Sequence, residues 1–203
     1  MSAEAVYGAA WYDEVMVEDG SPAMVPLEDS PWLTVYEALA SMIDPHEEVV
    51  DLGCGTGRFI ELLRRNGHYA KITGVDWSRA ALEEAKAYAG GMHGGTRQPV
   101  WLCQDLNEWT YDPLRAGNTV YVCSEVLEHM PDDLGLIRRL PPGHRFLFTV
   151  PNFWSESHLR VFTSVGDLWT RYDSLLYFRL WRMVGSDRQG IHVCEARRRG
   201  DSW

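Results

Sequence analysis

Apolar and polar residues change their spacing along the chain, and the changes mark alternating strands and helices. Short apolar runs rich in β-branched residues predict strands at residues 48–52, 71–76, 99–104, 119–123 and 144–150. Between these runs apolar residues recur at helical spacing, which predicts helices at residues 59–65, 79–89 and within 127–140. Strands that alternate with helices are typical of a parallel sheet covered by helices.

Residues that start or stop helices stand at the ends of several of these segments. Ser78 is placed to cap the second helix, and Gly90 and Gly91 follow its last turn. Pro131 either interrupts the third helix or delays its start.

The C-terminal part of the chain has a different pattern. After a short helix expected at 166–172, residues 175–183 and 191–199 predict two strands joined through the loop at 185–190. Strands joined by a short loop pair antiparallel. We therefore expect five parallel strands with a C-terminal hairpin at the edge of the sheet. Residues 1–45 read as irregular chain with a helix near 32–41, forming a cover rather than a second domain.

The amino-acid composition limits which cellular location and which binding partners we expect for the protein. The 203 residues carry a formal net charge of −10, which disfavours a nucleic acid as partner. The one basic cluster, residues 197–199, is interpreted as a solvated chain end. Because no apolar run approaches the ~20 residues that span a bilayer, and no secretory signal is recognisable, we expect a cytoplasmic protein without a membrane segment. The four cysteines stand alone and are expected to be reduced thiols.

The run VVDLGCGTGRF at residues 49–59 places an acid and three glycines where a strand passes into a helix. Backbone N–H groups at such a helix start can face a nucleotide or another nucleoside ligand. The dinucleotide fingerprint GxGxxG, counted from Gly53, requires glycine at position 58, where this chain has Arg58. The third glycine is instead Gly57, and the resulting GxGxG spacing argues against a pyrophosphate ligand.

Two further acids close the next two predicted strands. Asp76 follows the glycines by about 20 residues, where a carboxylate can accept hydrogen bonds from ribose hydroxyls. Asp105 closes the strand after it and could accept from the exocyclic amine of adenine. Together with Asp51 these acids create a negative field that suits a cation. The pattern predicts an adenosine joined to a group other than phosphate.

With GVDWS at 74–78, QDL at 104–106 and VCSEVLEHMPDD at 122–133, the glycine run resembles the ordered motifs of class I S-adenosylmethionine-dependent methyltransferases. The resemblance covers roughly residues 45–155. It implies an α/β fold with a Rossmann-like seven-stranded sheet, mostly parallel with an antiparallel C-terminal hairpin, and helices on both faces. It also implies S-adenosyl-L-methionine as cofactor. The residues expected to contact it are Asp51, Gly53, Cys54, Gly55, Gly57, Asp76, Trp77, Asp105, Leu106 and Ser124.

The resemblance makes residues 1–203 a single methyltransferase domain. Its parts are an N-terminal cover (1–45), a cofactor-binding core (46–155), and a substrate-side loop with the C-terminal hairpin (156–203). Tyr7, Trp11 and Tyr12 lie in the cover, a region with which this family often closes its site. We expect the cover to become ordered when the cofactor binds.

The segment SEVLEHMPDD at 124–133 holds the candidates for chemistry. In a helix, Glu125, Glu128 and His129 would share one face. One interpretation gives them structural roles only, and a second makes His129 a general base oriented by a carboxylate. A third adds His158, so that all four residues bind a divalent cation such as Mg, Mn or Fe. That arrangement resembles the small-RNA 2′-O-methyltransferases, and the EVLEH segment at 125–129 also resembles the ubiquinone-type O-methyltransferases. We name His129 as the candidate base and assign no metal.

The function expected from these features is methyl transfer from S-adenosylmethionine to a small-molecule acceptor, with oxygen as the favoured acceptor atom. The alternatives are an RNA or protein methyltransferase, metal-assisted or not, and a non-catalytic partner subunit with this fold. The sequence leaves the acceptor and the oligomeric state open.

Overall fold

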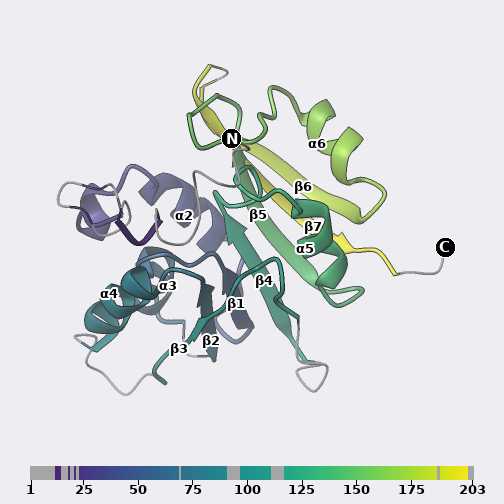
Figure 1. Cartoon of the computed structure of the whole chain (residues 1–203). Coiled ribbons are helices and arrows are strands. Elements are labelled where there is room, and N and C mark those ends of the chain that lie inside the picture. Colours follow the sequence, from purple (N-terminus) through teal and green to yellow (C-terminus); the bar gives the residue numbers. More distant parts are fainter. Residues whose placement is uncertain are drawn as a thin grey trace. The chain divides into compact units, whose positions relative to one another are not determined.

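The helices and strands of the computed structural model follow the order expected from the sequence (Figure 1). The structure describes residues 12–14, 18, 21, 23–68, 70–90, 97–110, 117–186 and 188–200. The strands form one seven-stranded sheet. The chain divides into two compact units, Met1–Leu106 and Asn107–Trp203, and each is described by itself.

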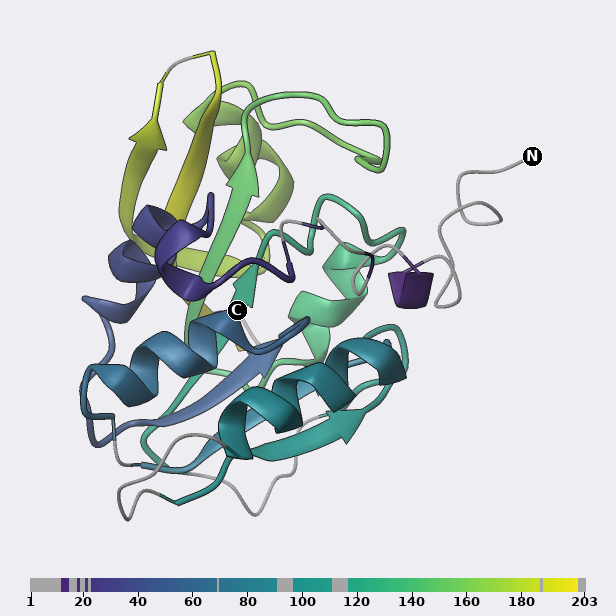
Figure 2. The same ribbon diagram turned by 90° about the vertical axis from the view of Figure 1, so that its left-hand side faces the viewer.

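The first unit is built on three parallel strands. They are β1 (Glu48–Leu52), β2 (Ile72–Asp76) and β3 (Val100–Cys103), with β2 in the middle. Helices α3 (Arg58–Arg65) and α4 (Arg79–Gly90) lie side by side on one face of these strands (Figure 2). A 3₁₀ turn, η2 (Leu27–Asp29), and helix α2 (Leu33–Ala40) precede β1. The side chains of β2 are buried throughout, as expected for a central parallel strand.

The second unit combines parallel and antiparallel pairing. Strand β4 (Thr119–Ser124) runs parallel to β5 (Arg145–Pro151), whereas β7 (Gly190–Arg198) pairs antiparallel with both β5 and β6 (Leu176–Gly185). The unit also holds α5 (Asp133–Arg139) and α6 (Val165–Tyr172). The strand order in the sheet is β3-β2-β1-β4-β5-β7-β6. The prediction of a mostly parallel Rossmann-like sheet with an antiparallel C-terminal hairpin is confirmed.

The third predicted helix begins later than a continuous helical pattern would place it. Glu128 and His129 lie in a turn, and α5 starts only at Asp133, after Pro131. Glu125 has a φ of 56°, in the left-handed region, which a right-handed helix cannot include. The expectation that the two glutamates and His129 share one helix face is therefore wrong, and the alternative in which Pro131 delays the helix is confirmed.

The C-terminal arginines have structural partners. Arg197 and Arg198 belong to β7, and Arg198 is only 4% exposed. The Arg198 guanidinium donates hydrogen bonds to the carbonyls of Ile137 and Arg138, which lie in the last turn of α5. Basic side chains at this position neutralise the unpaired carbonyls of a helix end. The interpretation of residues 197–199 as a solvated chain end is wrong for Arg198, which is buried. Arg197 and Arg199 are exposed, although each donates a hydrogen bond to a backbone carbonyl.

All four cysteines remain thiols, as expected. Cys54, Cys123 and Cys194 are buried, whereas Cys103 at the end of β3 is exposed. Among the described helices, none combines the length and the apolar character needed to cross a bilayer.

The indole of Trp101 packs where two glycines leave room for it. A Cβ atom on Gly74, in the middle of β2, would lie 2.7 Å from the Trp101 ring and 2.8 Å from the Cys54 sulfur. A Cβ atom on Gly57 would lie 2.9 Å from the same ring. The indole from β3 thus packs directly against the backbone of β2 and of the loop that leads into α3.

Replacing Gly74 with alanine is expected to lower the free energy of unfolding by about 1–3 kcal/mol, because the new methyl group must displace a packed ring. Urea denaturation measures this change. Gly117→Ala is the matched control, since no atom lies within 4 Å of the position of its Cβ. A Gly74→Ala protein as stable as the parent would contradict the packing described.

Candidate functional site

The glycine-rich loop between β1 and α3 has a backbone that requires glycine. Gly53, Gly55 and Gly57 have φ values of 79°, 51° and 78°, a region that other residues rarely adopt. The N–H groups of Gly53 and Cys54 both donate to the carbonyl of Val75, at 2.8 and 3.1 Å, which attaches the loop to β2. The sequence therefore produces a tight, bare stretch of main chain beside the end of β2.

The carboxylate of Asp76 fixes the shape of this loop. Its Oδ2 accepts a hydrogen bond from the Gly55 N–H and its Oδ1 accepts one from the Ser78 N–H, each at 2.8 Å. Burial raises the pKa of Asp76, while these N–H donors act to lower it. Each carboxylate oxygen has a second lone pair. Asp76 can therefore hold the loop and still accept a hydrogen bond from a ligand hydroxyl.

Asp51 is buried in the same region without comparable partners. It is 2% exposed, and its Oδ2 has no hydrogen-bond partner among the described residues. Burial, and then the nearby charge of Asp76, raises the pKa of Asp51 to about 7. A buried acceptor of this kind is costly unless a donor or a cation reaches it. The loop therefore fits a ligand that carries positive charge, as S-adenosylmethionine does.

The other residues expected at the cofactor site lie at the ends of β2 and β3. Trp77 is half-buried, and its ring is 5.4 Å from that of Tyr12 in the N-terminal segment. Asp105 is half-buried and Leu106 is buried, both just beyond β3. The first unit thus contains all the predicted cofactor residues except Ser124. Tyr7 and Trp11 of the predicted cover lie outside the described residues.

Arg58, which the sequence analysis used only as evidence against a dinucleotide-binding motif, also has a structural role. The side chain is 5% exposed, and its guanidinium lies 3.7 Å from the centre of the Tyr88 ring. It pairs with Glu61 at 3.1 Å and donates to the Met24 carbonyl at 3.1 Å. Thr56 similarly donates to the carbonyl of Ala23 at 2.7 Å. Both interactions attach the N-terminal segment to the loop, and neither follows from local sequence spacing.

The second unit holds Ser124 and the candidates for chemistry. The Thr149 hydroxyl donates to the Glu125 carboxylate at 2.8 Å and accepts from the Glu125 N–H at 3.0 Å. The Ser124 hydroxyl lies 3.0 Å from the same Thr149 oxygen. Thr149, on β5, therefore holds the strained start of the turn, a role that sequence reasoning did not identify.

Glu128, His129 and His158 come together although they are not on one helix. Their potential ligand atoms all lie within 4.8 Å of one another, and the two imidazole rings are 4.9 Å apart. Glu125 is not part of this group. Burial and the charge of Glu125 raise the pKa of Glu128 well above its usual range. Burial also raises the pKa of Glu125 to about 7 and lowers that of His129 to about 4.

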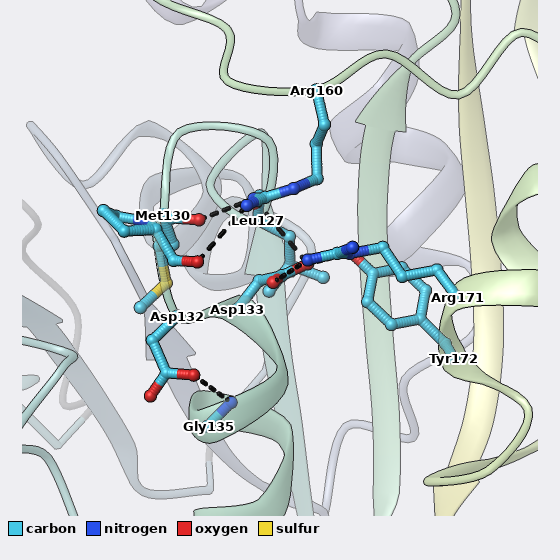
Figure 3. Close-up of polar contacts among 9 residues, drawn as sticks. Leu127, Met130, Asp132, Asp133, Gly135, Arg160, Arg171 and Tyr172 are labelled. Carbon is cyan, nitrogen blue, oxygen red and sulfur yellow. Dashed lines mark hydrogen bonds and ion pairs between the residues drawn. The ribbon is translucent and has the colours of Figure 1, made fainter. Parts of the chain in front are cut away.

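Arg160 supports the turn that carries Glu128 and His129 (Figure 3). Its guanidinium donates to the carbonyls of Leu127 and Met130 and lies 3.6 Å from Asp133. The sequence gives no local signal for this role, because the contacts span about thirty positions.

Asp133 in turn is held by two side chains of α6. Arg171 donates to both of its carboxylate oxygens, at 2.7 and 2.6 Å, and the Tyr172 hydroxyl donates at 2.7 Å. Asp133 itself is fully buried, so these charge-assisted bonds satisfy it. The network connects the turn, α5 and α6 within the second unit.

A family model described as a methyltransferase domain matches residues 29–198, most of the chain. The chain belongs to the class I S-adenosylmethionine-dependent methyltransferases. Among its methyltransferase relatives, the ubiquinone biosynthesis O-methyltransferase of Coxiella burnetii is 32% identical over 124 residues, covering 59% of this chain and 49% of the relative. The Vibrio cholerae protein of the same name is 34% identical over 114 residues, covering 51% and 42%. The chain spans about half the length of these relatives.

Solved structures share the methyltransferase fold at low identity. NodS, an N-methyltransferase of Bradyrhizobium japonicum solved with S-adenosylhomocysteine, has a TM-score of 0.67 and 16% identity and covers 94% of this chain and 97% of its own. A chain from a complex of the Haloferax volcanii Trm112 methyltransferase activator has a TM-score of 0.70, 17% identity and coverages of 93% and 98%. The [4+2]-cyclase SpnF has a TM-score of 0.74, 16% identity and coverages of 98% and 97%. The fold is thus shared by proteins with different reactions.

The raised pKa of Asp51 in this methyltransferase makes stability depend on pH. Because the folded state holds the Asp51 proton up to about pH 7, and the unfolded state releases it near its ordinary pKa of 3.8, folding loses stability as pH rises between these values. Asp51→Asn should remove this loss. We expect the variant to gain on the order of 4 kcal/mol over the parent between pH 4 and pH 8.

Urea unfolding at several pH values between 4 and 8 measures the difference. Asp173→Asn, at an exposed position, serves as control and should follow the parent. Parallel curves for the parent and Asp51→Asn would show that Asp51 is not held in a desolvated site.

Proposed function

We propose that this chain is a cytoplasmic enzyme that transfers a methyl group from S-adenosylmethionine to an oxygen atom of a small molecule. The observation that carries the proposal is the glycine loop, whose three left-handed glycines follow Asp51 in the chain and whose Gly55 N–H donates to Asp76. Oδ2 of Asp51 is buried without a hydrogen-bond partner among the described residues. The O-methyltransferases among its relatives support oxygen as acceptor atom. The formal net charge of −10 favours a small acceptor over RNA.

The residues of the loop have distinct roles in this proposal. Asp76 binds the ribose hydroxyls with the lone pairs that its two backbone donors leave available. Asp51 faces the positively charged methionine part, and Asp105 accepts from adenine. S-adenosylmethionine supplies an activated methyl group when bound. The protein then has mainly to align the acceptor, because proximity alone can contribute roughly 7–11 kcal/mol.

Oxygen acceptors must also lose a proton. His129 is the candidate base from the sequence, but a pKa of about 4 makes it a weak one near neutral pH. Glu125, with a pKa of about 7, is better matched to that task. Its carboxylate is positioned by the Thr149 hydroxyl at 2.8 Å. We therefore extend the proposal to Glu125 as an additional candidate base.

Calorimetry with S-adenosylmethionine, and separately with NAD, tests the cofactor assignment. We expect binding of S-adenosylmethionine only, and at least about a tenfold weaker affinity in Asp76→Asn, because charged hydrogen bonds to the ribose are lost. Asp173→Asn should bind as the parent does. Tighter binding of NAD than of S-adenosylmethionine would overturn the proposal.

The predicted ordering of the N-terminal cover has its own test. The contacts of Ala23 and Met24 with the loop, and of Tyr12 with Trp77, connect this segment to the cofactor region. S-adenosylhomocysteine should therefore slow proteolytic cleavage within residues 5–30. Mass spectrometry of the fragments, with and without this ligand, identifies the cleaved bonds. Equal cleavage rates would mean that the cover does not respond to the cofactor.

A further inference from the structure

The carboxylate of Glu128 is buried without a compensating partner. The side chain is 0% exposed, and neither of its oxygens has a hydrogen-bond partner on another described residue. Buried carboxylates in folded proteins are paired, protonated or bound to a metal. Glu128 also approaches an imidazole, since its Oε1 lies 3.7 Å from Nε2 of His129.

The two histidines near Glu128 are oriented through their other ring nitrogens. Nδ1 of His129 lies 3.0 Å from the Ser157 carbonyl, and Nδ1 of His158 lies 3.2 Å from the Phe153 carbonyl. A carbonyl oxygen only accepts, so both Nδ1 atoms carry hydrogen. In the neutral tautomer the lone pair of each ring is therefore on Nε2. Histidines that bind metals are typically fixed in this way by a backbone carbonyl.

The potential ligand atoms of the three side chains lie close enough together to bind one ion. Their ligand atoms lie within 4.8 Å of one another, whereas two ligands on one ion at about 2.1 Å are at most about 4.2 Å apart. Small side-chain rotations close the difference. Glu125 is held by Thr149 and lies outside the group, so the four-residue cation site considered from the sequence is reduced to three ligands.

The backbone around this group is held in place. Arg160 donates to the carbonyls of Leu127, Met130 and Pro131, and the Leu159 N–H donates to the Glu128 carbonyl at 2.9 Å. These bonds tie the turn that carries two of the ligands to the loop that carries the third. A site with supported ligands needs little reorganisation to bind.

We propose that Glu128, His129 and His158 bind one divalent transition-metal cation. Two imidazoles and one carboxylate suit Mn²⁺, Fe²⁺ or Zn²⁺ better than Mg²⁺, which prefers oxygen ligands. Three protein ligands leave coordination positions open, as in catalytic metal sites. The role of the cation, which rests on the proposed methyl transfer, is to bind the acceptor oxygen and lower the pKa of its hydroxyl. The hydroxyl proton would pass to Glu125, the additional candidate base. The oxygen would then bond to the methyl carbon while the carbon–sulfur bond breaks, which releases S-adenosylhomocysteine.

Calorimetry of the chelator-treated protein with MnCl₂, ZnSO₄ and MgCl₂ tests the site. We expect one Mn²⁺ or Zn²⁺ per chain, and at least a tenfold weaker affinity for both Glu128→Gln and His158→Asn. His144→Asn is the matched control, since this half-buried histidine also bonds a backbone carbonyl through Nδ1, and it should leave metal binding unchanged. Mn²⁺ electron paramagnetic resonance of the parent should report two nitrogen ligands, and His158→Asn should lose one of them and keep that of His129.

Several results would overturn the site. They are no binding of Mn²⁺ or Zn²⁺, tighter binding of Mg²⁺ than of Mn²⁺, or unchanged binding in both ligand variants. Binding of S-adenosylhomocysteine by each variant shows that it is folded, and the less buried His158 provides a second test if Glu128→Gln does not fold. Failure of the parent to bind S-adenosylmethionine while it binds Mn²⁺ would count against the proposed function and leave the metal site standing.

Discussion

The carboxylate of Asp76 is the interaction on which the candidate cofactor site depends. One oxygen holds the N–H of Gly55, in the middle of the glycine loop, and the other holds the N–H of Ser78, at the start of α4. These charge-assisted bonds are buried, where they are stronger than in water. A single side chain thereby joins the end of β2, the loop after β1 and the helix that follows. Gly55, whose N–H the carboxylate holds, is itself one of the three left-handed glycines of the loop.

In the second unit, several side chains support the turn at residues 125–132, which the left-handed backbone of Glu125 keeps from being helical. Its start is held by Thr149, and its carbonyls are held by Arg160. Asp133 anchors the other end through Arg171 and Tyr172. This support keeps several ionisable groups buried close together. Burial raises the pKa of Glu128 and lowers the pKa of His129. Such clusters are more typical of functional sites than of a protein interior built for stability.

Much of the fold followed from hydrophobic periodicity. Strand β1 has the predicted bounds, and the other strands and the helices α3 and α4 differ from prediction by one or two residues at their ends. Ser78 caps α4 as expected, with its hydroxyl accepting from the Ala81 N–H at 3.0 Å. These features depend on local sequence, which is why they could be predicted. The glycine loop was also recognisable, because left-handed backbone restricts the residue type.

The errors share a physical cause. Glu125, Glu128 and His129 have helical spacing, but Thr149 and Pro131 impose a turn, and the first of these lies on another strand. The buried Arg198 was misjudged for the same reason. Arg198 caps a helix about sixty positions earlier in the chain, and charge alone suggested solvent exposure. Tertiary partners of this kind leave no periodic signal.

The uneven burial of the thiols has a practical consequence. Three cysteines are inaccessible, and burial raises the pKa of Cys54 and Cys194, which makes them poor nucleophiles. Cys103 alone is exposed, and it lies two residues before Asp105. A maleimide fluorophore would therefore attach to the native chain at one defined position without prior mutagenesis. Its emission could follow the arrival of ligands at the first unit in real time.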